Sequence, residues 1–315
     1  MIRWVASIFA VLLLSACAEE RVPRDTGSPD GGTDSDTEAA LVLPESAGVH
    51  QLTLEHDGAE RRFDLVIPGD LSGNSSLLIV LHGTGGSGPS FRMLRQSLVR
   101  MADERGWVLV FPSALESNIT MRTRWNYDGD PEQPDDVGFI LKLAEVVGSA
   151  LPTAQDEAFL TGFSNGGRLV HQLIALHPKA FAAGAPIGSN LGVRVSEESD
   201  EGITAPPTGP VPILMGNGSD DSSVPWDGGA VGGGFAAPVQ EAIDRWVTAN
   251  GCDAAATREP FESGGGFIDT WAQGCTDGTV VIQVGYQTSR HEWPDPGDIQ
   301  GWDASSGVLD FFESL

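Results

Sequence analysis

The sequence has 315 residues, of which 40% are hydrophobic and 20% are charged, a balance that is typical of a globular fold and excludes a largely disordered chain. Its formal net charge is −26, and no run of lysine and arginine along the sequence reverses this field locally. Because the nucleic-acid backbone is also negatively charged, we do not expect nucleic acid as a partner.

The first 17 residues have the pattern of an export signal. A cationic Arg3 precedes an apolar run from Val5 to Leu14, which is too short for an ordinary membrane span. The following "LSAC" resembles a bacterial lipobox, so we expect Cys17 to be diacylated and to become the mature N-terminus. Such an anchor would hold the protein on a membrane. The alternative is an ordinary secretory signal in which Cys17 is incidental.

Residues 18–41 are rich in Asp, Gly, Ser and Thr and nearly lack large apolar side chains, which predicts a disordered acidic tether. Ala18 and Glu19 stand where an aspartate commonly retains lipoproteins at the inner membrane. We therefore expect an outer-membrane or cell-surface location, with release from the cell as the alternative. Residues 42–315 are left for a single folded domain.

Apolar periodicity predicts the elements of this domain. Two alternating runs around Asp57-Gly58 indicate a β-hairpin. Short apolar runs indicate buried strands at 76–83, 107–112, 158–162, 212–217 and 279–284. Spacings of three and four indicate helices over 91–101, 137–147 after Asp135 and Asp136 as capping candidates, 169–176 and 239–247. We therefore predict an α/β-hydrolase fold: an N-terminal antiparallel hairpin and a mostly parallel central sheet with helices on both faces.

Ser164 is the candidate nucleophile. It is the centre of Gly162-Phe163-Ser164-Asn165-Gly166, a G-x-S-x-G pattern. The pattern alone is weak in a chain with 40 glycines. Here it follows a predicted strand and precedes a predicted helix, which is the setting in which a sharp turn exposes a reactive serine.

A reactive serine needs a base and an acid, which follow it in this fold in the order acid, then histidine. Of the six histidines, five precede Ser164 or lie on or just after the helix that follows it. His291 alone lies in a loop after the last predicted strand, so it is the candidate base. Asp220 and Asp221 both follow the strand at 212–217 and are both candidates for the acid, although either can instead form the turn.

The oxyanion of the reaction needs backbone donors. One is expected from the amide of Asn165, directly after the nucleophile, and the other from the glycine-rich loop at 81–88, where we assign it to Thr84. The same loop is a poor candidate for phosphate binding, because no Gly-Lys-Ser/Thr follows it. This chemistry requires no metal and no organic cofactor.

Two cysteines remain after Cys17, namely Cys252 and Cys275. An even pair in an exported chain predicts a disulfide, with two buried free thiols as the alternative. Neither cysteine has a second ligand at the spacing of a zinc site.

These motifs resemble those of exported esterases that include polyhydroxybutyrate depolymerases and the feruloyl and acetylxylan esterases of carbohydrate esterase family 1. The resemblance extends from about residue 62 to 312 and rests on "LHGTGG", "WNYDGDPEQPDDVGFI", "LTGFSNGG", "GNGSDDSSVPWDGG", "WAQGC" and "HEWPDPG". It implies a serine esterase that acts on small-molecule or oligomeric esters.

The resemblance also implies roles for individual residues. The family pattern Gly-x-x-Asp-x-x-Val-Pro matches 218–225 and favours Asp221 as the acid, although Asn217 stands where the family commonly has a histidine. It implies a bridge between Cys252 and Cys275. It also places Trp125 and Trp293 near the active site as substrate-binding residues, whereas packing in the core is the commoner role of a tryptophan.

The predicted function is therefore hydrolysis of short soluble, carbohydrate-linked or hydroxyalkanoate-oligomer esters through an acyl-enzyme. Alternatives are a polyhydroxybutyrate depolymerase that acts on polymer, a serine peptidase of similar fold, and a non-catalytic surface-binding lipoprotein on the same fold.

Overall fold

The computed structural model describes residues 41–73, 75–118, 120–152, 158–231, 233–288, 290–295 and 301–315. The predicted signal peptide, Cys17 and all but the last residue of the predicted tether lie outside the described residues, so these remain predictions. Within the described ranges, no helix combines the length and the apolar character needed to cross a membrane.

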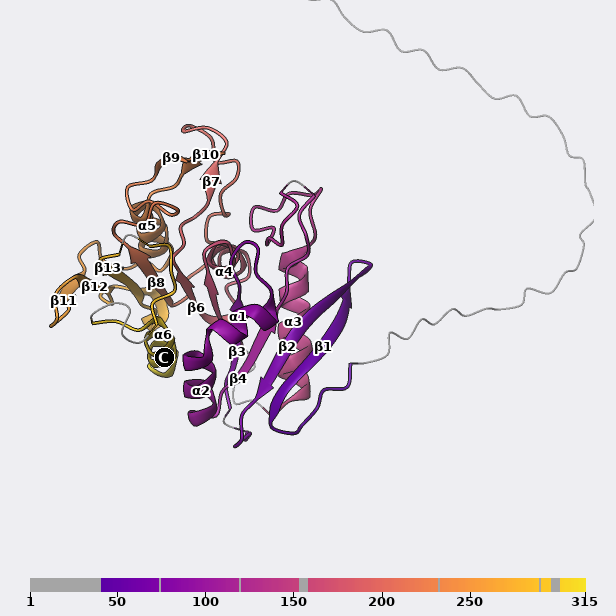
Figure 1. The fold of residues 1–315 in the computed structure, drawn as a ribbon. Coiled ribbons are helices and arrows are strands. Elements are labelled where there is room, and N and C mark those ends of the chain that lie inside the picture. Colours follow the sequence, from indigo (N-terminus) through magenta and orange to yellow (C-terminus); the bar gives the residue numbers. More distant parts are fainter. Residues whose placement is uncertain are drawn as a thin grey trace, which may run out of the picture. The chain divides into compact units, whose positions relative to one another are not determined.

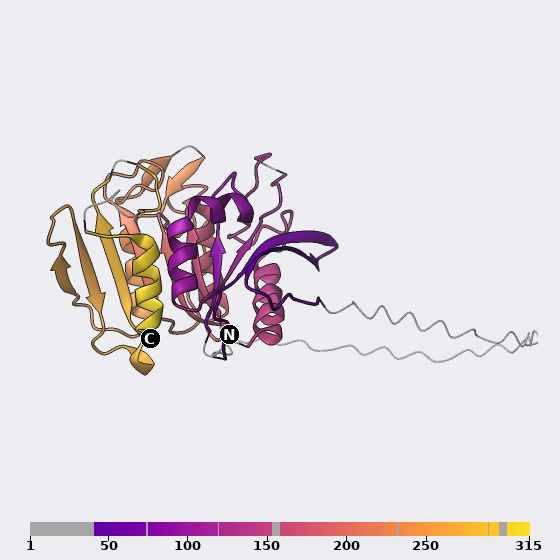
Figure 2. The same cartoon turned by 60° about the horizontal axis from the view of Figure 1, so that its bottom comes forward.

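The core of the domain is a ten-stranded sheet in the order β1-β2-β4-β3-β5-β6-β8-β13-β12-β11. The six strands from β4 to β13 in this order are parallel, and the two at each edge are antiparallel to their neighbours. Figures 1 and 2 show the hairpin β1–β2 at one edge of the sheet and the hairpin β11–β12 at the other. The strands are β1 Gly48–His56, β2 Ala59–Ile67, β3 Leu77–Leu81, β4 Val108–Pro112, β5 Ala158–Phe163, β6 Phe181–Ile187, β8 Ile213–Gly218, β11 Thr257–Pro260, β12 Gly266–Trp271 and β13 Val281–Tyr286.

Helices cover both faces of the sheet. Strand β3 shows why, because Leu77, Ile79 and Leu81 join one apolar core whereas Leu78 and Val80 join the other. Helices α3 Asp136–Ala150, α4 Asn165–Leu176 and α5 Val239–Ala249 pack into the first core, and α1 Gly88–Leu94, α2 Gln96–Glu104 and α6 Ala304–Glu313 pack into the second. A small sheet of β7 Val193–Arg194, β10 Gly234–Ala236 and β9 Gly229–Val231 and a short 3-10 helix η1 Thr276–Gly278 complete the described elements. The predicted fold class is confirmed.

The predicted hairpin is present. Strands β1 and β2 pair up to His56 and Ala59, which leaves Asp57 and Gly58 as a two-residue turn. Their φ angles are 51° and 70°, the left-handed conformation at both positions that suits the twist of a tight hairpin.

Strand β6 is absent from the predicted elements, although it lies at the centre of the sheet. Its sequence, Phe-Ala-Ala-Gly-Ala-Pro-Ile, has few of the branched residues that indicate a strand. Small residues are needed here because helix α4 packs closely on it. A Cβ on Gly184 would lie 2.8 Å from Ile174 and 3.0 Å from Val170.

The helix predicted over 91–101 is wrong in one respect, because it is two helices. The chain leaves the helical conformation at Arg95, where φ is −107° and ψ is 44°. The Arg95 side chain donates hydrogen bonds to the Asp295 carboxylate at 2.6 Å and to the Trp293 carbonyl at 3.3 Å. The break therefore lies where this segment meets the loop that carries His291.

Of the two aspartates expected to cap the third helix, only Asp135 does so, by accepting a hydrogen bond from the Gly138 amide at 2.9 Å. Asp136 is fully buried and pairs with Arg61 at 2.5 Å. It also accepts a hydrogen bond from the Asn126 amide at 2.7 Å. The pair therefore fixes the loop before α3 to strand β2.

The structure contains the disulfide between Cys252 and Cys275. It joins the segment after α5 to the segment after β12.

Helix α4 carries a buried histidine that the predicted chemistry does not use. The indole N–H of Trp246, on α5, donates to Nδ1 of His171 at 3.0 Å, and an indole can only donate, so the neutral imidazole carries its proton on Nε2. Nε2 has no partner among the described residues. Burial lowers the pKa of His171 to about 3, and the charges of Arg245 and Arg168 act in the same direction.

We predict that this histidine makes the fold sensitive to acid. In the unfolded chain it binds a proton near its ordinary pKa of 6.5, whereas in the folded chain it does so only near 3. Above pH 6.5, protonation of this histidine therefore does not change the free energy of unfolding. Below that pH, protonation of His171 in the unfolded chain lowers the free energy of unfolding by about 1.4 kcal/mol per pH unit. Urea unfolding of wild type and His171→Gln at pH 7 and pH 5 should show a smaller loss of stability in the variant. Equal losses of stability in wild type and His171→Gln would show that His171 is not the source of the acid sensitivity.

Candidate active site

Four parallel strands deliver the candidate residues to one edge of the sheet. The glycine-rich loop follows β3, Ser164 follows β5, Asp221 follows β8 and His291 follows β13. Because the carboxyl ends of parallel strands share an edge, residues far apart in the sequence meet there.

Ser164 occupies a strained turn between β5 and α4. Its φ of 55° and ψ of −117° are rare for a residue with a side chain, and its amide donates to the Ile187 carbonyl at 3.0 Å. The turn is close to the end of β3. A Cβ on Gly166 would lie 2.6 Å from the carbonyl oxygens of Leu81 and His82, so glycine is required there.

The three side chains form one hydrogen-bonded series. Nε2 of His291 lies 2.8 Å from Oγ of Ser164, and Nδ1 lies 2.6 Å from Oδ2 of Asp221. A carboxylate accepts, so we assign the imidazole proton to Nδ1, and Nε2 is then free to accept the proton of the serine hydroxyl. This is the relative arrangement of nucleophile, base and acid in serine hydrolases.

The structure distinguishes the two adjacent aspartates. Asp221 is 4% exposed, and its second oxygen accepts hydrogen bonds from the amides of Ser223 at 2.8 Å and Val224 at 3.1 Å. These bonds fix the carboxylate toward His291. Asp220 is exposed, and its carboxylate accepts from the hydroxyl of Ser219.

The expected oxyanion donors belong to segments next to Ser164: Asn165 follows it directly, and a Cβ on Gly83, which precedes Thr84, would lie 3.4 Å from Cβ of Ser164. The Asn165 amide is the first of helix α4, where amides have no partner within the helix. The Thr84 amide belongs to the same peptide group as the Gly83 carbonyl and points the opposite way. That carbonyl accepts from Nδ1 of His82 at 2.8 Å and from the Gly86 amide at 3.1 Å, so the peptide orientation is fixed.

His82 holds this peptide as a neutral side chain. Burial lowers its pKa to about 4, and its Nε2 accepts a hydrogen bond from the Ala114 amide at 3.0 Å. With Nε2 accepting, Nδ1 carries the proton that is donated to the Gly83 carbonyl. His82 is not among the predicted site residues, although the pair His82-Gly83 directly precedes Thr84.

A cavity of about 490 Å³ adjoins the triad. Its walls include Trp293, Phe91, Phe163, Leu94 and the loop of Thr84. The Trp293 ring meets Phe91 edge-on at 6.0 Å between centroids, so the wall next to His291 is aromatic. Trp293 thus lies where a substrate-binding residue is expected.

Comparison with known proteins agrees with this geometry. No family model matches the sequence. A protein of Nocardia uniformis subsp. tsuyamanensis that is named an esterase, NocK, is 27% identical over 69% of this chain and 65% of its own length, which is just under two thirds. A protein of Aspergillus niger with the name "Probable feruloyl esterase C" is 28% identical over 73% of this chain and 74% of its own length.

A solved structure, the acetyl xylan esterase from Aspergillus awamori, superposes on this chain with a TM-score of 0.57. It is 13% identical and covers 85% of this chain and 100% of its own, so it establishes the fold. The chain has the α/β-hydrolase fold and is similar in sequence to proteins named esterases. The predicted resemblance to esterases and the predicted fold are confirmed at the level of these relatives.

The structure gives Trp125 a role that differs from the prediction. Its ring is fully buried, and its indole N–H donates to the His82 carbonyl at 2.8 Å. Its backbone amide and carbonyl both bond the side chain of Asn165, at 2.7 and 3.1 Å. The prediction that Trp125 binds substrate is wrong, because the ring has no surface left for it. Trp125 instead links the oxyanion loop to the turn of the nucleophile.

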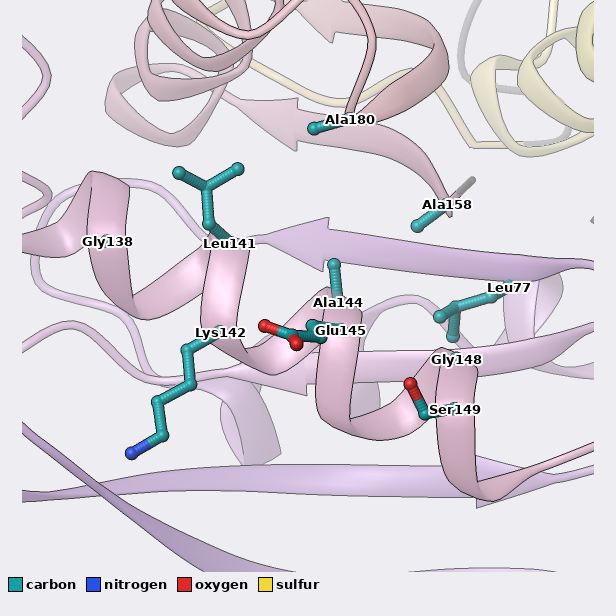
Figure 3. A pocket seen from close by; sticks show the side chains of 10 residues that line it. All are labelled: Leu77, Gly138, Leu141, Lys142, Ala144, Glu145, Gly148, Ser149, Ala158 and Ala180. Atoms are coloured by element: carbon teal, nitrogen blue, oxygen red, sulfur yellow. The ribbon is translucent and has the colours of Figure 1, made fainter. Parts of the chain in front are cut away.

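A larger cavity, of about 610 Å³, lies elsewhere on the domain. Figure 3 shows it beside Leu77, Ala158 and Ala180, which begin or precede strands β3, β5 and β6, with Lys142 and Glu145 of α3 alongside. The amino ends of these strands are at the edge opposite Ser164. We therefore assign substrate to the smaller cavity next to the triad. The described residues hold no group of three or more metal-ligating side chains.

We predict that Trp125→Phe lowers kcat about tenfold on every ester, because the His82 carbonyl loses a buried donor worth about 1–1.5 kcal/mol. KM should change little. A substrate-binding role would instead raise KM selectively for bulky esters, so steady-state kinetics with acetate and feruloyl esters separates the two. Unchanged kcat with raised KM would restore the original prediction.

Proposed function

We propose that the protein hydrolyses short carboxylic esters through an acyl-enzyme formed on Ser164. The hydrogen-bonded series from Ser164 through His291 to Asp221 carries this proposal.

In the first half of the reaction, Oγ of Ser164 attacks the ester carbonyl carbon and its proton passes to Nε2 of His291. Asp221 stabilises the resulting imidazolium. The amides of Asn165 and Thr84 stabilise the negative oxygen of the tetrahedral intermediate. When the bond to the leaving alcohol breaks, His291 returns the proton to that alcohol.

In the second half, a water molecule gives a proton to His291 and attacks the acyl carbon. The bond to Oγ breaks, Ser164 regains its proton and the free acid leaves. All proton transfers use Nε2 of one histidine, so Asp221 has to hold one orientation of the ring throughout.

The cavity beside the triad favours small esters with an aryl or sugar-linked group. Phe91, Phe163 and Trp293 provide flat apolar surfaces within about 490 Å³. The names of the relatives, feruloyl esterase and acetylxylan esterase, favour the same substrates. A hydroxyalkanoate chain, which alternates apolar and ester groups, also suits a cavity lined by both aromatic and polar residues, so hydroxybutyrate oligomers are a further candidate. We expect turnover of soluble esters and oligomers, and no comparable clearing of crystalline polyhydroxybutyrate on plates.

We predict that Ser164→Ala and His291→Ala each lower turnover of 4-nitrophenyl acetate about a thousandfold or more, because nucleophile and base act as a unit. Asp221→Asn should be far more damaging than Asp220→Asn. Circular dichroism and thermal unfolding should show that all four variants remain folded.

Retention of more than a few per cent of wild-type turnover by folded Ser164→Ala would contradict the assignment. A larger loss of turnover in Asp220→Asn than in Asp221→Asn would identify Asp220 as the acid of the triad. Folded wild type that shows no turnover on any ester, together with no labelling of Ser164 by a fluorophosphonate, would favour the non-catalytic binding lipoprotein.

The proposal extends to location. The lipobox-like sequence and the pair of disulfide-bonded cysteines support export, followed by anchoring through Cys17. In a bacterial host, wild type should incorporate labelled palmitate and partition with membranes, because two or more acyl chains bind stably. Cys17→Ser should do neither. Equal labelling of the two chains would contradict a lipid anchor.

A further inference from the structure

Three arginines stand apart from the ion pairs of this acidic protein. The protein has 44 acidic and 18 basic residues, and most described arginines have a carboxylate within 4.0 Å. Within the described ranges, Arg122, Arg124 and Arg168 have no such partner. In a chain with a net charge of −26, uncompensated guanidinium groups require an explanation.

These arginines belong to segments that contact the oxyanion loop or continue from the turn of Ser164. Gly85, in the oxyanion loop, donates its amide to the Thr123 carbonyl at 2.8 Å, and the Thr123 hydroxyl donates to the Gly86 carbonyl at 2.6 Å. The segment that carries Arg122 and Arg124 is thus bound to the loop. A Cβ on Gly85 would lie 3.6 Å from Nε of Arg122, so this guanidinium lies against the loop itself.

Arg168 belongs to helix α4. It is one helical turn after Ser164, whose carbonyl accepts its backbone amide at 3.1 Å. The guanidinium groups of Arg168 and Arg124 lie 5.4 and 5.5 Å from the centre of the same ring, that of Tyr127. Nε of Arg168 also donates to the side chain of Asn190 at 3.3 Å. An aromatic face and an amide hold these groups without neutralising their charge.

Both guanidinium groups keep their charge at this ring, so an anion that reaches either of them gains an ion pair. Guanidinium groups present parallel N–H donors that match the two oxygens of a carboxylate. The field of the whole protein repels anionic substrates, so an anionic ester would need a local reversal of charge next to Ser164. None of the three arginines lines the aromatic cavity, so the two regions could hold different parts of one substrate.

We propose that Arg122, Arg124 and Arg168 form a subsite for a free carboxylate carried by the ester substrate. The proposal rests on the proposed esterase function and specifies its substrate class: esters in which the acid part or the alcohol part is itself a carboxylate, such as an acylated uronic acid or a dicarboxylic monoester.

The test uses two pairs of esters that differ only in charge. In 4-acetoxybenzoate and its methyl ester the charge is on the alcohol part, and in 4-nitrophenyl hemisuccinate and 4-nitrophenyl acetate it is on the acid part. For each pair, the ratio of kcat/KM for the charged over the neutral ester is measured in wild type, Arg122→Gln and the double variant Arg122→Gln/Arg168→Gln. Arg62→Gln is the matched control, because Arg62 is exposed on β2 and pairs only with Glu60.

For at least one pair, the ratio should fall about tenfold in the double variant and less in Arg122→Gln, through KM for the charged ester, because a charge-assisted hydrogen bond is lost. The pair that responds identifies the part of the ester that carries the anion. Arg62→Gln should keep the wild-type ratio. Ratios that are the same in all four proteins for both pairs would overturn the subsite.

A binding measurement separates this proposal from the esterase function. Isothermal titration with benzoate and with benzamide needs no turnover. Wild type should bind benzoate more tightly than the double variant does, and the two proteins should not differ with benzamide. Equal affinities of the two proteins for benzoate would overturn the subsite even if ester hydrolysis is found, whereas a difference would support it even if none is.

Discussion

The active site depends on one close contact, between the turn at Ser164 and the end of strand β3. The turn holds Ser164 in a conformation that costs about 1–3 kcal/mol for a residue with a side chain. It persists because helix α4 starts against the carbonyls of Leu81 and His82, where only glycine fits at position 166. The same contact brings the loop of Thr84 close to the serine, since a Cβ on Gly83 would lie 3.4 Å from Cβ of Ser164. The proposed nucleophile and the proposed oxyanion donors therefore share one packing constraint.

A series of buried polar contacts holds the turn of Ser164 and the loop of Thr84 in place. The ion pair of Arg61 and Asp136 fixes the Asn126 amide, and the neighbouring Trp125 bonds both Asn165 and the His82 carbonyl. His82 in turn holds the peptide of Thr84 through the Gly83 carbonyl. Buried polar groups of this kind are costly when one partner is lost. The turn of Ser164 and the loop of Thr84 thus rest on buried side chains outside the triad.

The sequence predicts the parts of this arrangement that follow from local pattern. The five apolar runs became strands, the Asp57-Gly58 turn formed a hairpin, and chain order selected His291 from six histidines. Asp221 needed the family pattern, because spacing alone left Asp220 equally suitable. Only the fold shows that backbone amides orient one of the two carboxylates.

Other features depend on contacts that no local pattern reveals. Strand β6 is made of small residues because α4 packs on it, and the helix break at Arg95 coincides with a contact to Asp295, 200 residues away in the sequence. The structural role of Trp125 depends on its hydrogen bonds to the Asn165 side chain and the His82 carbonyl, which are far from it in the sequence. The sequence shows no basic cluster, since Arg168 joins Arg122 and Arg124 only when α4 and the loop before α3 come together.

The most direct test of an acyl-enzyme on Ser164 is a rapid-mixing experiment with excess 4-nitrophenyl acetate. The account predicts a burst of 4-nitrophenol equal to one molar equivalent of folded chain, followed by a slower steady rate, with the acetyl group found on the peptide that contains Ser164 when the reaction is quenched in acid. Steady release without a burst, and with no acetyl group on that peptide under conditions that slow deacylation, would contradict it.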